Sequence, residues 1–524
     1  MKSIKNTPAL GILAIFLAIK LVLHLCLNSQ WSFHRDELLY LALGRHLDWG
    51  YASVPAGIGF WAWFGDHILG GSVWAIRFIS TVFGTATVLL TGLMAREMLP
   101  KAPQTGHFGL FLIGMAGLLS GAYLRPCMLF MPVVFDIFYW SLLCWLLLKY
   151  INTEKPAWLL WLGVAAGLGL LNKYTVLICL FALLPGIVFS PLRRVFSARQ
   201  FYIAVGLALL IFLPNIVWQA ERQFPVFRHM TELAQSQFAH VSLTGFLGDQ
   251  LLFFLPALPI WLCGLYFLLF QKAGVRWRIF GWMYLVVLAV LLIFSAKSYY
   301  SLGAYPVLVA AGAAFLQSKV DGGARWIRVA LPAFMLLTGV ISFPTSIPLF
   351  APEKEARFIK KMAIMPGLES ILRWEDGQYY DLPQDFADML GWSELAQKTT
   401  ETWQKIPNKS TAAIFADSYG QAGAIDYFGR NQGLPRVLSF SDNYRYWLPE
   451  RLPNDFQTLI YVNGELGDDM PGFFQNIEKI WELDMPLSRQ HGDQIYLCRN
   501  PTPAFFERMN TAFARARTNA DIDD

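Results

Sequence analysis

Apolar runs long enough to cross a lipid bilayer recur through the first 350 residues of this 524-residue chain, and this feature limits the possible folds more than any other. With 55% apolar residues, 15% charged residues and a mean hydropathy of +0.41, the composition excludes an ordinary soluble enzyme, a disordered chain and a coiled coil. Segment 157–189 can be two helices, one long helix or a re-entrant pair. We predict a polytopic α-helical membrane protein with eleven spans, at residues 8–27, 78–95, 108–124, 133–148, 157–171, 174–189, 201–218, 251–270, 279–294, 302–316 and 329–348.

The basic residues fall mainly on one side of these predicted spans. With the N-terminus in the cytoplasm, the cytoplasmic segments hold 15 Lys and Arg in 58 residues, and the opposite segments hold 8 in 99. The positive-inside rule is met in this way only if 157–189 crosses twice, turning at Asn172-Lys173. An odd number of spans then places the C-terminal part outside the cytoplasm.

The charge balance changes sign near residue 350. Up to Leu349 there are 24 basic and 11 acidic residues, and from Phe350 onward 18 basic and 26 acidic residues. We therefore predict a transmembrane module at 1–349, with large outer loops at 28–77 and 219–250, and a soluble extracytoplasmic α/β domain with a polar end at 350–524. Within that domain, residues 412–415, 458–462 and 494–497 predict strands, and 471–480 predicts a helix.

Two adjacent carboxylates, Asp36 and Glu37, follow the first predicted span closely enough to lie near the outer membrane face. Such a pair can divide the work of a transfer reaction, because one carboxylate can take a proton from an acceptor hydroxyl while the other positions a group or a cation. The alternative is a solvated loop in which the pair is bridged to Arg35 or Arg45.

Three basic residues, Arg125, Lys173 and Lys297, lie in predicted outer segments, where the positive-inside rule disfavours them. Cations at this depth suit the phosphate of a lipid, and the alternative for each is contact with ordinary headgroups. Asp136 is a lone carboxylate at the start of the fourth predicted span. It is either a hydrogen-bond partner of a neighbouring helix or a polar group at the outer mouth of the bundle.

Motifs that would indicate other chemistry are missing from the sequence. It has no Walker-type phosphate loop and no His/Cys cluster with metal-ligand spacing, and a nucleotide-sugar site of the Rossmann kind has no place among the spans. We therefore predict no cofactor, no metal and no nucleic-acid partner, and leave a carboxylate-bound divalent cation as an open alternative. A sugar donor, if one is used, should be linked to a lipid.

Several segments of the chain are similar to motifs of one enzyme family. Residues 33–40 together with 44–51 resemble the first-loop signature of bacterial family 39 glycosyltransferases, which belong with the protein O-mannosyltransferases and the aminoarabinose transferase of lipid A. Further similar segments follow in the family's order, at 167–175, 213–219, 297–308 and 418–426. The chain departs from the family pattern at 52–56 and at 440–443, and these departures bear on specificity rather than on the reaction class.

The resemblance implies a GT-C fold, with many transmembrane helices and an active site at the outer face beneath a soluble domain. It also implies an inverting transfer from a polyprenyl-phosphate sugar, with Asp36 as the catalytic base. We therefore predict a glycosyltransferase of the bacterial inner membrane that uses an undecaprenyl-phosphate sugar and membrane lipids as partners. Its acceptor would be lipid A, another glycolipid, a polysaccharide or a protein.

The predicted site assigns each candidate residue a role. Asp36 and Glu37 are the catalytic residues, and the donor phosphate is bound by Lys173, Lys297 and Arg125. A flippase or transporter of a lipid-linked saccharide is the alternative, since it would use the same cations without a base. A sensor domain on a membrane anchor is a third and weaker reading. Supporting roles are predicted for Arg35, Asp136, Tyr174, Tyr299 and Tyr300.

Overall fold

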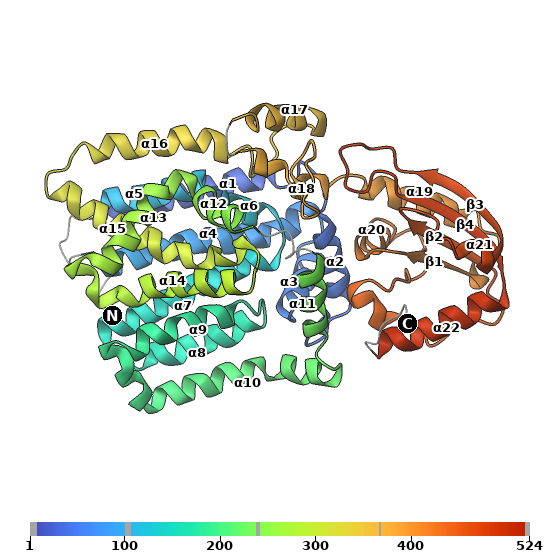
Figure 1. Ribbon diagram of the computed structural model, residues 1–524, viewed down its shortest axis with the longest axis horizontal. Coiled ribbons are helices and arrows are strands. Elements are labelled where there is room, and N and C mark those ends of the chain that lie inside the picture. Colours follow the sequence, from blue (N-terminus) through green and yellow to red (C-terminus); the bar gives the residue numbers. More distant parts are fainter. Residues whose placement is uncertain (1–7, 100–105, 237–241, 366–367, 519–524) are drawn as a thin grey trace. The chain divides into compact units, whose positions relative to one another are not determined.

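The structure is a computed structural model that describes residues 8–99, 106–236, 242–365 and 368–518 (Figure 1). The chain forms two compact units, and each is described by itself. The first unit comprises Met1–Ser29, Trp74–Ile216 and Leu233–Leu349. The second comprises Gln30–Val73, Val217–Glu232 and Phe350–Asp524. The second unit therefore combines the C-terminal part of the chain with most of the first predicted outer loop.

The first unit is a bundle of apolar helices. Helix α10 continues into the second unit at its C-terminal end, and helix α4 begins at the boundary. The bundle consists of α1 (Pro8–Leu27), α4 (Val73–Met98), α5 (His107–Leu119), α6 (Gly121–Met128), α7 (Pro132–Thr153), α8 (Ala157–Leu170), α9 (Val176–Val188), α10 (Arg199–Glu221), α12 (Leu243–Leu252), α13 (Leu258–Phe270), α14 (Arg278–Ile293), α15 (Tyr305–Asp321) and α16 (Ile327–Ser342).

Six helices in the described part of the chain are long and apolar enough to cross a membrane. Three further pairs qualify if each bent pair is one span: α5 with α6, α9 with the 3-10 helix Pro191–Ser197, and α12 with Leu255–Phe270, bent by 52°, 111° and 72°. This confirms a polytopic helical membrane protein with six to nine candidate spans. The predicted spans at 157–171 and 329–348 coincide with the shorter apolar helices α8 and α16, so the count of eleven stays a prediction.

The second unit combines helices with a small sheet. Its helices are α2 (Arg35–Arg45), α3 (Gly57–His67), α11 (Pro225–Ser236, at the boundary with the first unit), α17 (Pro352–Met362), α18 (Gln384–Ala387), α19 (Trp392–Gln404), α20 (Tyr419–Phe428), α21 (Met470–Phe473) and α22 (Pro503–Arg517). Its strands are β1 (Ala412–Ala416), β2 (Thr458–Asn463), β3 (Phe474–Glu482) and β4 (Gln494–Pro501).

The four strands form one mixed sheet in the order β1-β2-β4-β3. Strand β1 pairs with β2 in parallel, and β4 pairs with both β2 and β3 in antiparallel fashion. The strands predicted at 412–415, 458–462 and 494–497 are confirmed as β1, β2 and β4. The helix predicted at 471–480 is wrong, because after the single turn of α21 the chain enters β3. Hydrogen bonding to β4 overrides the helical spacing of the apolar residues there.

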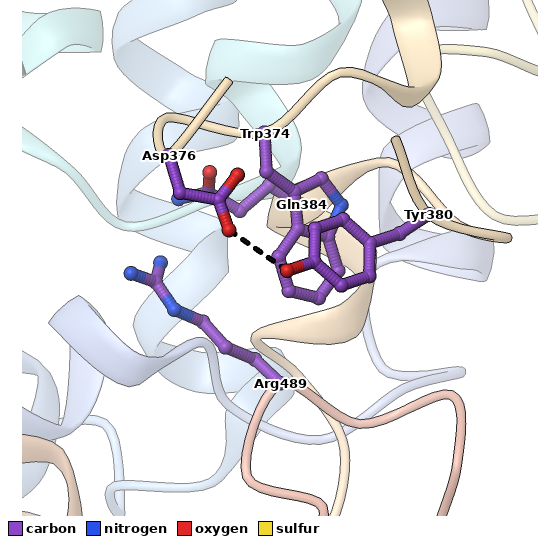
Figure 2. A pocket seen from close by; sticks show the side chains of 5 residues that line it. All are labelled: Trp374, Asp376, Tyr380, Gln384 and Arg489. Carbon is purple, nitrogen blue, oxygen red and sulfur yellow. Dashed lines mark hydrogen bonds between the residues drawn. The ribbon is translucent and has the colours of Figure 1, made fainter. Parts of the chain in front are cut away.

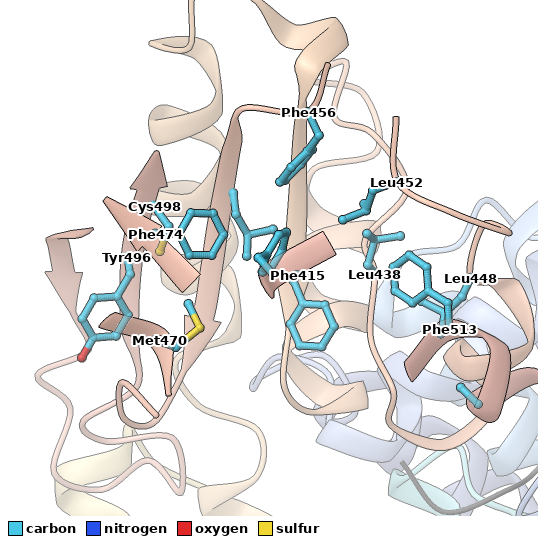
Figure 3. Packing of buried hydrophobic residues seen from close by; sticks show 13 residues of the cluster. Phe415, Leu438, Leu448, Leu452, Phe456, Met470, Phe474, Tyr496, Cys498 and Phe513 are labelled. Carbon is cyan, nitrogen blue, oxygen red and sulfur yellow. The ribbon is translucent and has the colours of Figure 1, made fainter. Parts of the chain in front are cut away.

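The hydrophobic core of this unit lies between the sheet and helix α22 (Figure 3). Phe415 of β1, Phe474 of β3 and Cys498 of β4 contribute to it from the sheet, and Phe505 and Phe513 from α22. All five side chains are buried. Because β1 is anchored in this core, the turn that follows it holds the start of α20 in a fixed position, and that turn carries part of the candidate site.

Candidate active site

The acidic motif of the first predicted outer loop lies at the N-terminus of helix α2. His34 is the N-cap, and its ring accepts a hydrogen bond from the backbone N–H of Asp36 at 3.1 Å. The carboxylate of Glu37 accepts a hydrogen bond from the backbone N–H of His34 at 2.7 Å, which completes a capping box. Glu37 is fully buried, whereas Asp36 is half-buried. The two neighbours therefore differ, because the carboxylate of Glu37 fixes the helix start whereas Asp36 is only partly buried and is not part of the capping box.

Tyr419 contacts Asp36 from a position 383 residues further along the chain. Its hydroxyl donates a hydrogen bond of 2.7 Å to Oδ1 of Asp36, and the guanidinium carbon of Arg35 lies 4.4 Å from the centre of its ring. Tyr419 is the first residue of α20, directly after the N-cap Ser418, whose hydroxyl accepts a hydrogen bond from the backbone of Gln421. A capped helix start thus aims a rigid phenol at the carboxylate.

Two glycines allow α20 to approach α2 so closely. A Cβ atom added at Gly420 would lie 2.7 Å from the Cγ of Arg35 and 2.8 Å from the ring of Trp392. A Cβ atom added at Gly423 would lie 2.9 Å from the backbone of Leu38. Both distances are shorter than a van der Waals contact, so only glycine fits at these two positions of the segment 418–426.

A second carboxylate, Asp388, lies on the other side of His34. Its Oδ2 is 3.7 Å from Nε2 of His34 and 3.2 Å from Nη1 of Arg489. Its backbone carbonyl accepts a hydrogen bond from the N–H of Arg35 at 3.0 Å, which ties the loop after α18 to the start of α2. Asp388 is almost completely buried, so the guanidinium of Arg489 and the nearby imidazole of His34 offset the cost of burying its charge.

The electrostatic environment keeps Asp36 ionised. Burial acts to raise the pKa of Asp36, but the charges of His34 and Arg35 and the hydrogen bond from Tyr419 outweigh burial, so the pKa lies below its ordinary value. Burial and the Asp36 carboxylate raise the pKa of Tyr419, which therefore remains a hydrogen-bond donor. Burial also raises the pKa of Asp388. At neutral pH the site thus holds a carboxylate that can accept a proton.

Three buried polar atoms around Asp36 have no hydrogen-bond partner among the described residues: Nε2 of His34, Nε of Arg35 and Oδ1 of Asp388. Buried polar atoms in folded proteins are normally paired. Their grouping around one carboxylate is consistent with a site that completes its hydrogen bonds with the hydroxyl groups of a substrate.

The first unit contains a separate cluster of cations and aromatic rings. Nζ of Lys173 lies 5.0 Å from the ring centre of Tyr299 and 4.9 Å from that of Tyr300, and Nζ of Lys297 lies 5.8 Å from that of Tyr299. Asp136 is buried and near enough to Lys173 for a direct electrostatic interaction. Two ammonium groups against one carboxylate leave a net positive charge, which suits an anionic group.

The backbone that carries Lys297 and the two tyrosines is held by hydrogen bonds that its neighbouring side chains donate to α12. The 3-10 helix Ser298–Ala304 follows Lys297, and its Ser298 hydroxyl donates to Asp249 at 2.6 Å. Ser301 and Tyr305 donate to the side-chain carbonyl of Gln250 at 2.7 and 2.8 Å. These buried bonds fix the segment against the bundle, so the cluster is preorganised.

The comparisons with known proteins give this geometry a context. Residues 53–218 match the family model of dolichyl-phosphate-mannose-protein mannosyltransferases. The matched segment covers about a third of the chain and indicates a glycosyltransferase. A search of curated proteins by sequence found no match.

Two crystal structures of ArnT from Cupriavidus metallidurans share the fold of this glycosyltransferase. The form bound to undecaprenyl phosphate has a TM-score of 0.58 at 14% identity, covering 93% of this chain and 98% of that chain. The apo form has a TM-score of 0.57 at 13% identity, covering 94% and 98%. At this identity the likeness shows the fold alone.

The structure of this glycosyltransferase groups most of the residues predicted from its sequence. Arg35, Asp36 and Glu37 lie together in the second unit. Asp136, Lys173, Lys297, Tyr299 and Tyr300 lie together in the first unit.

Two other predicted residues of the glycosyltransferase lie on other elements of the first unit. The guanidinium of Arg125 donates a hydrogen bond to the carbonyl of Thr345 at 2.7 Å, near the end of α16. The hydroxyl of Tyr174 donates to Asn215 of α10 at 3.1 Å. No group of three or more metal-ligating side chains occurs among the residues that the structure describes.

Several partners of the Asp36 carboxylate in the glycosyltransferase could not be predicted from the sequence. Asp388 and Arg489 lie in segments without a motif, so no local pattern could reveal them. Tyr419 belongs to a segment that resembles the family, and this resemblance was the available signal. In the first unit, Asp249 was not predicted either, because a single carboxylate near a predicted span gives no indication that it accepts a hydrogen bond from Ser298.

Proposed function

We propose that this glycosyltransferase transfers a sugar from a polyprenyl-phosphate carrier to an envelope acceptor, with inversion at the anomeric carbon. The acceptor would be lipid A, another glycolipid, a polysaccharide or a protein. The observation that carries the proposal is the ionised, half-buried carboxylate of Asp36, which is held by Tyr419 at 2.7 Å. The fold shared with ArnT bound to undecaprenyl phosphate, and the family description naming dolichyl phosphate mannose, support a lipid-linked donor.

The acceptor side of the reaction requires a base. A hydroxyl of the acceptor transfers its proton to the Asp36 carboxylate while its oxygen attacks the anomeric carbon of the donor. The bond between that carbon and the phosphate oxygen breaks, and the polyprenyl phosphate leaves. We assign Asp36 rather than Glu37 as the base, because the carboxylate of Glu37 is buried and bonded in the capping box.

The donor side of the reaction requires positive charge. The carrier phosphate is a diester in the donor and a monoester when it leaves, so its negative charge grows during the reaction. Ammonium groups beside it therefore stabilise the transition state more than the ground state. We assign this role to Lys173 and Lys297, whose placement over Tyr299 and Tyr300 restricts their motion, and a further contribution to Arg125.

We further propose the cellular setting that the charge distribution predicts. The chain would cross a bacterial inner membrane eleven times, with the N-terminus in the cytoplasm and residues 350–524 outside it. The reaction would then occur at the outer face of the membrane. This placement follows from the excess of basic residues in the predicted cytoplasmic segments.

The proposal is tested with the purified protein in lipid nanodiscs. The protein is incubated with lipids and glycans extracted from the envelope of a strain that lacks the gene, and the products are followed by mass spectrometry. We expect one polyprenyl-phosphate sugar to be consumed, with an equal amount of polyprenyl phosphate released and one acceptor gaining the mass of a sugar. A flippase would move the lipid across a vesicle membrane without releasing polyprenyl phosphate, and that result would replace the proposal.

A further inference from the structure

A small cavity opens in the second unit next to the Asp36 site. Its volume is about 220 Å³, and it is lined by Trp374, Asp376, Tyr380, Gln384 and Arg489 (Figure 2). Pockets for drug-sized ligands measure about 300 Å³ or more. The cavity is therefore large enough for one ring-sized group rather than for an extended chain.

One wall of the cavity is aromatic and rigid. The rings of Trp374 and Tyr380 stack with their centres 3.7 Å apart and their planes at 21°. The indole N–H of Trp374 donates to the carbonyl of Leu382 at 2.8 Å, and the hydroxyl of Tyr380 donates to Asp376 at 2.8 Å. An aromatic face is electron-rich, so it attracts the polarised C–H groups on the flat face of a sugar ring.

The remaining lining groups are hydrogen-bonding partners of both kinds. Asp376 supplies a carboxylate acceptor, Gln384 an amide and Arg489 a guanidinium donor that faces Asp376 across the cavity (Figure 2). The charge of Arg489 is already balanced by Asp388 at 3.2 Å and Glu375 at 4.0 Å. Three carboxylates, those of Asp376, Asp388 and Glu375, surround this one guanidinium, so the site disfavours a phosphate and suits neutral hydroxyl groups.

Arg489 connects this cavity to the catalytic carboxylate. Its guanidinium pairs with Asp388, which lies 3.7 Å from His34, and His34 caps the helix that presents Asp36. Arg489 is also near enough to Asp36 to interact with it electrostatically. A ring bound in the cavity therefore lies next to the residues that hold the base.

We propose that the cavity lined by Trp374, Asp376, Tyr380, Gln384 and Arg489 is an acceptor subsite that binds one neutral pyranose ring of the acceptor. The ring packs on the stacked pair Trp374–Tyr380, and its hydroxyls bond to Asp376 and Gln384. This subsite rests on the proposed function and adds to it that the acceptor carries a saccharide unit, as a glycolipid, a polysaccharide or a glycosylated lipid does.

Direct binding tests the subsite without any transfer reaction. Methyl pyranosides of glucose, galactose, mannose and N-acetylglucosamine are mixed with the full-length protein in nanodiscs, and saturation transfer to the ring protons is measured by NMR. At least one of the four is expected to show saturation of its ring C–H protons. Asp376→Asn keeps the shape of the side chain and is expected to weaken this binding about 10-fold, since a hydrogen bond to a charged carboxylate becomes a weaker one to a neutral amide. Trp374→Ala removes the stacking wall and is expected to abolish the signal.

The matched control is Asp381→Asn. Asp381 is an exposed carboxylate of the same loop that pairs with Lys360 at 2.7 Å and does not line the cavity, so its variant should bind like the wild type. Absence of ring saturation for all four glycosides, or equal binding by Asp376→Asn and the wild type, overturns the subsite.

Acceptor kinetics separate the subsite from the proposed function. If the subsite is correct, Asp376→Asn shows about a 10-fold higher KM for the acceptor, whereas the control Asp381→Asn keeps the wild-type KM. An unchanged acceptor KM in Asp376→Asn refutes the subsite alone. Wild-type protein that transfers no sugar from a polyprenyl-phosphate donor to any acceptor refutes the proposed function.

Discussion

Replacing Tyr419 by Phe should shift the pH dependence of the reaction, because it removes one hydrogen bond to the proposed base and little else. The ring stays beneath the guanidinium of Arg35, and the hydroxyl that donates to Asp36 at 2.7 Å is lost. A hydrogen bond to a charged group contributes about 1.5 to 3 kcal/mol, and one pKa unit corresponds to about 1.4 kcal/mol. Since Asp36 is half-buried, solvent replaces part of this bond, so we take the lower end and expect its pKa to rise by about one unit.

The sign of the shift follows from the role of the base. Only ionised Asp36 accepts a proton, so activity falls as pH decreases through its pKa. The wild type should keep its activity well into the acid range, because the pKa of Asp36 lies below its ordinary value. Tyr419→Phe should lose activity about one pH unit higher, while kcat at pH 8 changes by less than about 10-fold.

The assay is the initial rate of polyprenyl phosphate release from about pH 3 to pH 8, so that the range includes the acid limb of the wild type, measured within the time over which the protein stays folded. Tyr427→Phe is the matched control, because Tyr427 lies on the same helix and its hydroxyl donates to the carbonyl of Gly71 at 2.6 Å instead. An acid limb at the same pH in Tyr419→Phe and the wild type would refute the reasoning.

Three further predictions follow from other parts of the structure. Lys173→Met and Lys297→Met should each lower kcat by roughly 10- to 1000-fold with a modest change in acceptor KM, and the double variant should lose less than the product; a rise in acceptor KM alone would exclude a phosphate ligand. Burial raises the pKa of Asp426 to about 6, so the stability that its protonated form contributes is lost as pH rises through 6. Asparagine does not titrate, so the free energy of unfolding of Asp426→Asn should rise by about 2 to 3 kcal/mol relative to that of the wild type between pH 4 and pH 7, as measured by thermal unfolding. A cysteine at the exposed Ser410 should react with an impermeant reagent in intact spheroplasts, and protection would reverse the topology.

The membrane helices were the most predictable part of the fold. In a lipid bilayer, the backbone N–H and C=O groups of an apolar run must form hydrogen bonds with one another, and a helix satisfies all of them. Hydropathy alone therefore indicates a helix. The break predicted at Asn172-Lys173 coincides with the turn between α8 and α9. Bends within the predicted spans could not be foreseen, because Ser120, where α5 gives way to α6 with extended backbone, has no local signal.

Strand β3 shows where local pattern fails. The apolar residues Phe474, Ile477 and Trp481 are spaced as on one face of a helix, yet the segment pairs with β4. An irregularity in the pairing between Lys479 and Trp481 breaks the alternation that would have identified a strand. The pairing partner, β4, is the next strand along the chain, and its hydrogen bonds to β3 rather than the spacing within β3 decide the outcome.

Part of the candidate site was predictable from the sequence, and part depends on the tertiary fold. The carboxylate of Asp36 was predictable from its place after the first span and from the family resemblance. The sequence did not distinguish Asp36 from Glu37, because their difference depends on a capping box. Asp388 and Arg489 come from segments more than 350 residues away, and only the folded structure brings them to His34.

The most direct test of the central claim compares donor binding and turnover in Asp36→Asn. Asparagine keeps the size of the side chain but cannot accept a proton at neutral pH. The account predicts that the variant binds polyprenyl phosphate within about 3-fold of the wild type, while its release of polyprenyl phosphate from the donor falls by about 100-fold or more. The exposed-carboxylate variant Asp381→Asn serves as the control. Near-normal turnover by folded Asp36→Asn would contradict the assignment of Asp36 as the base.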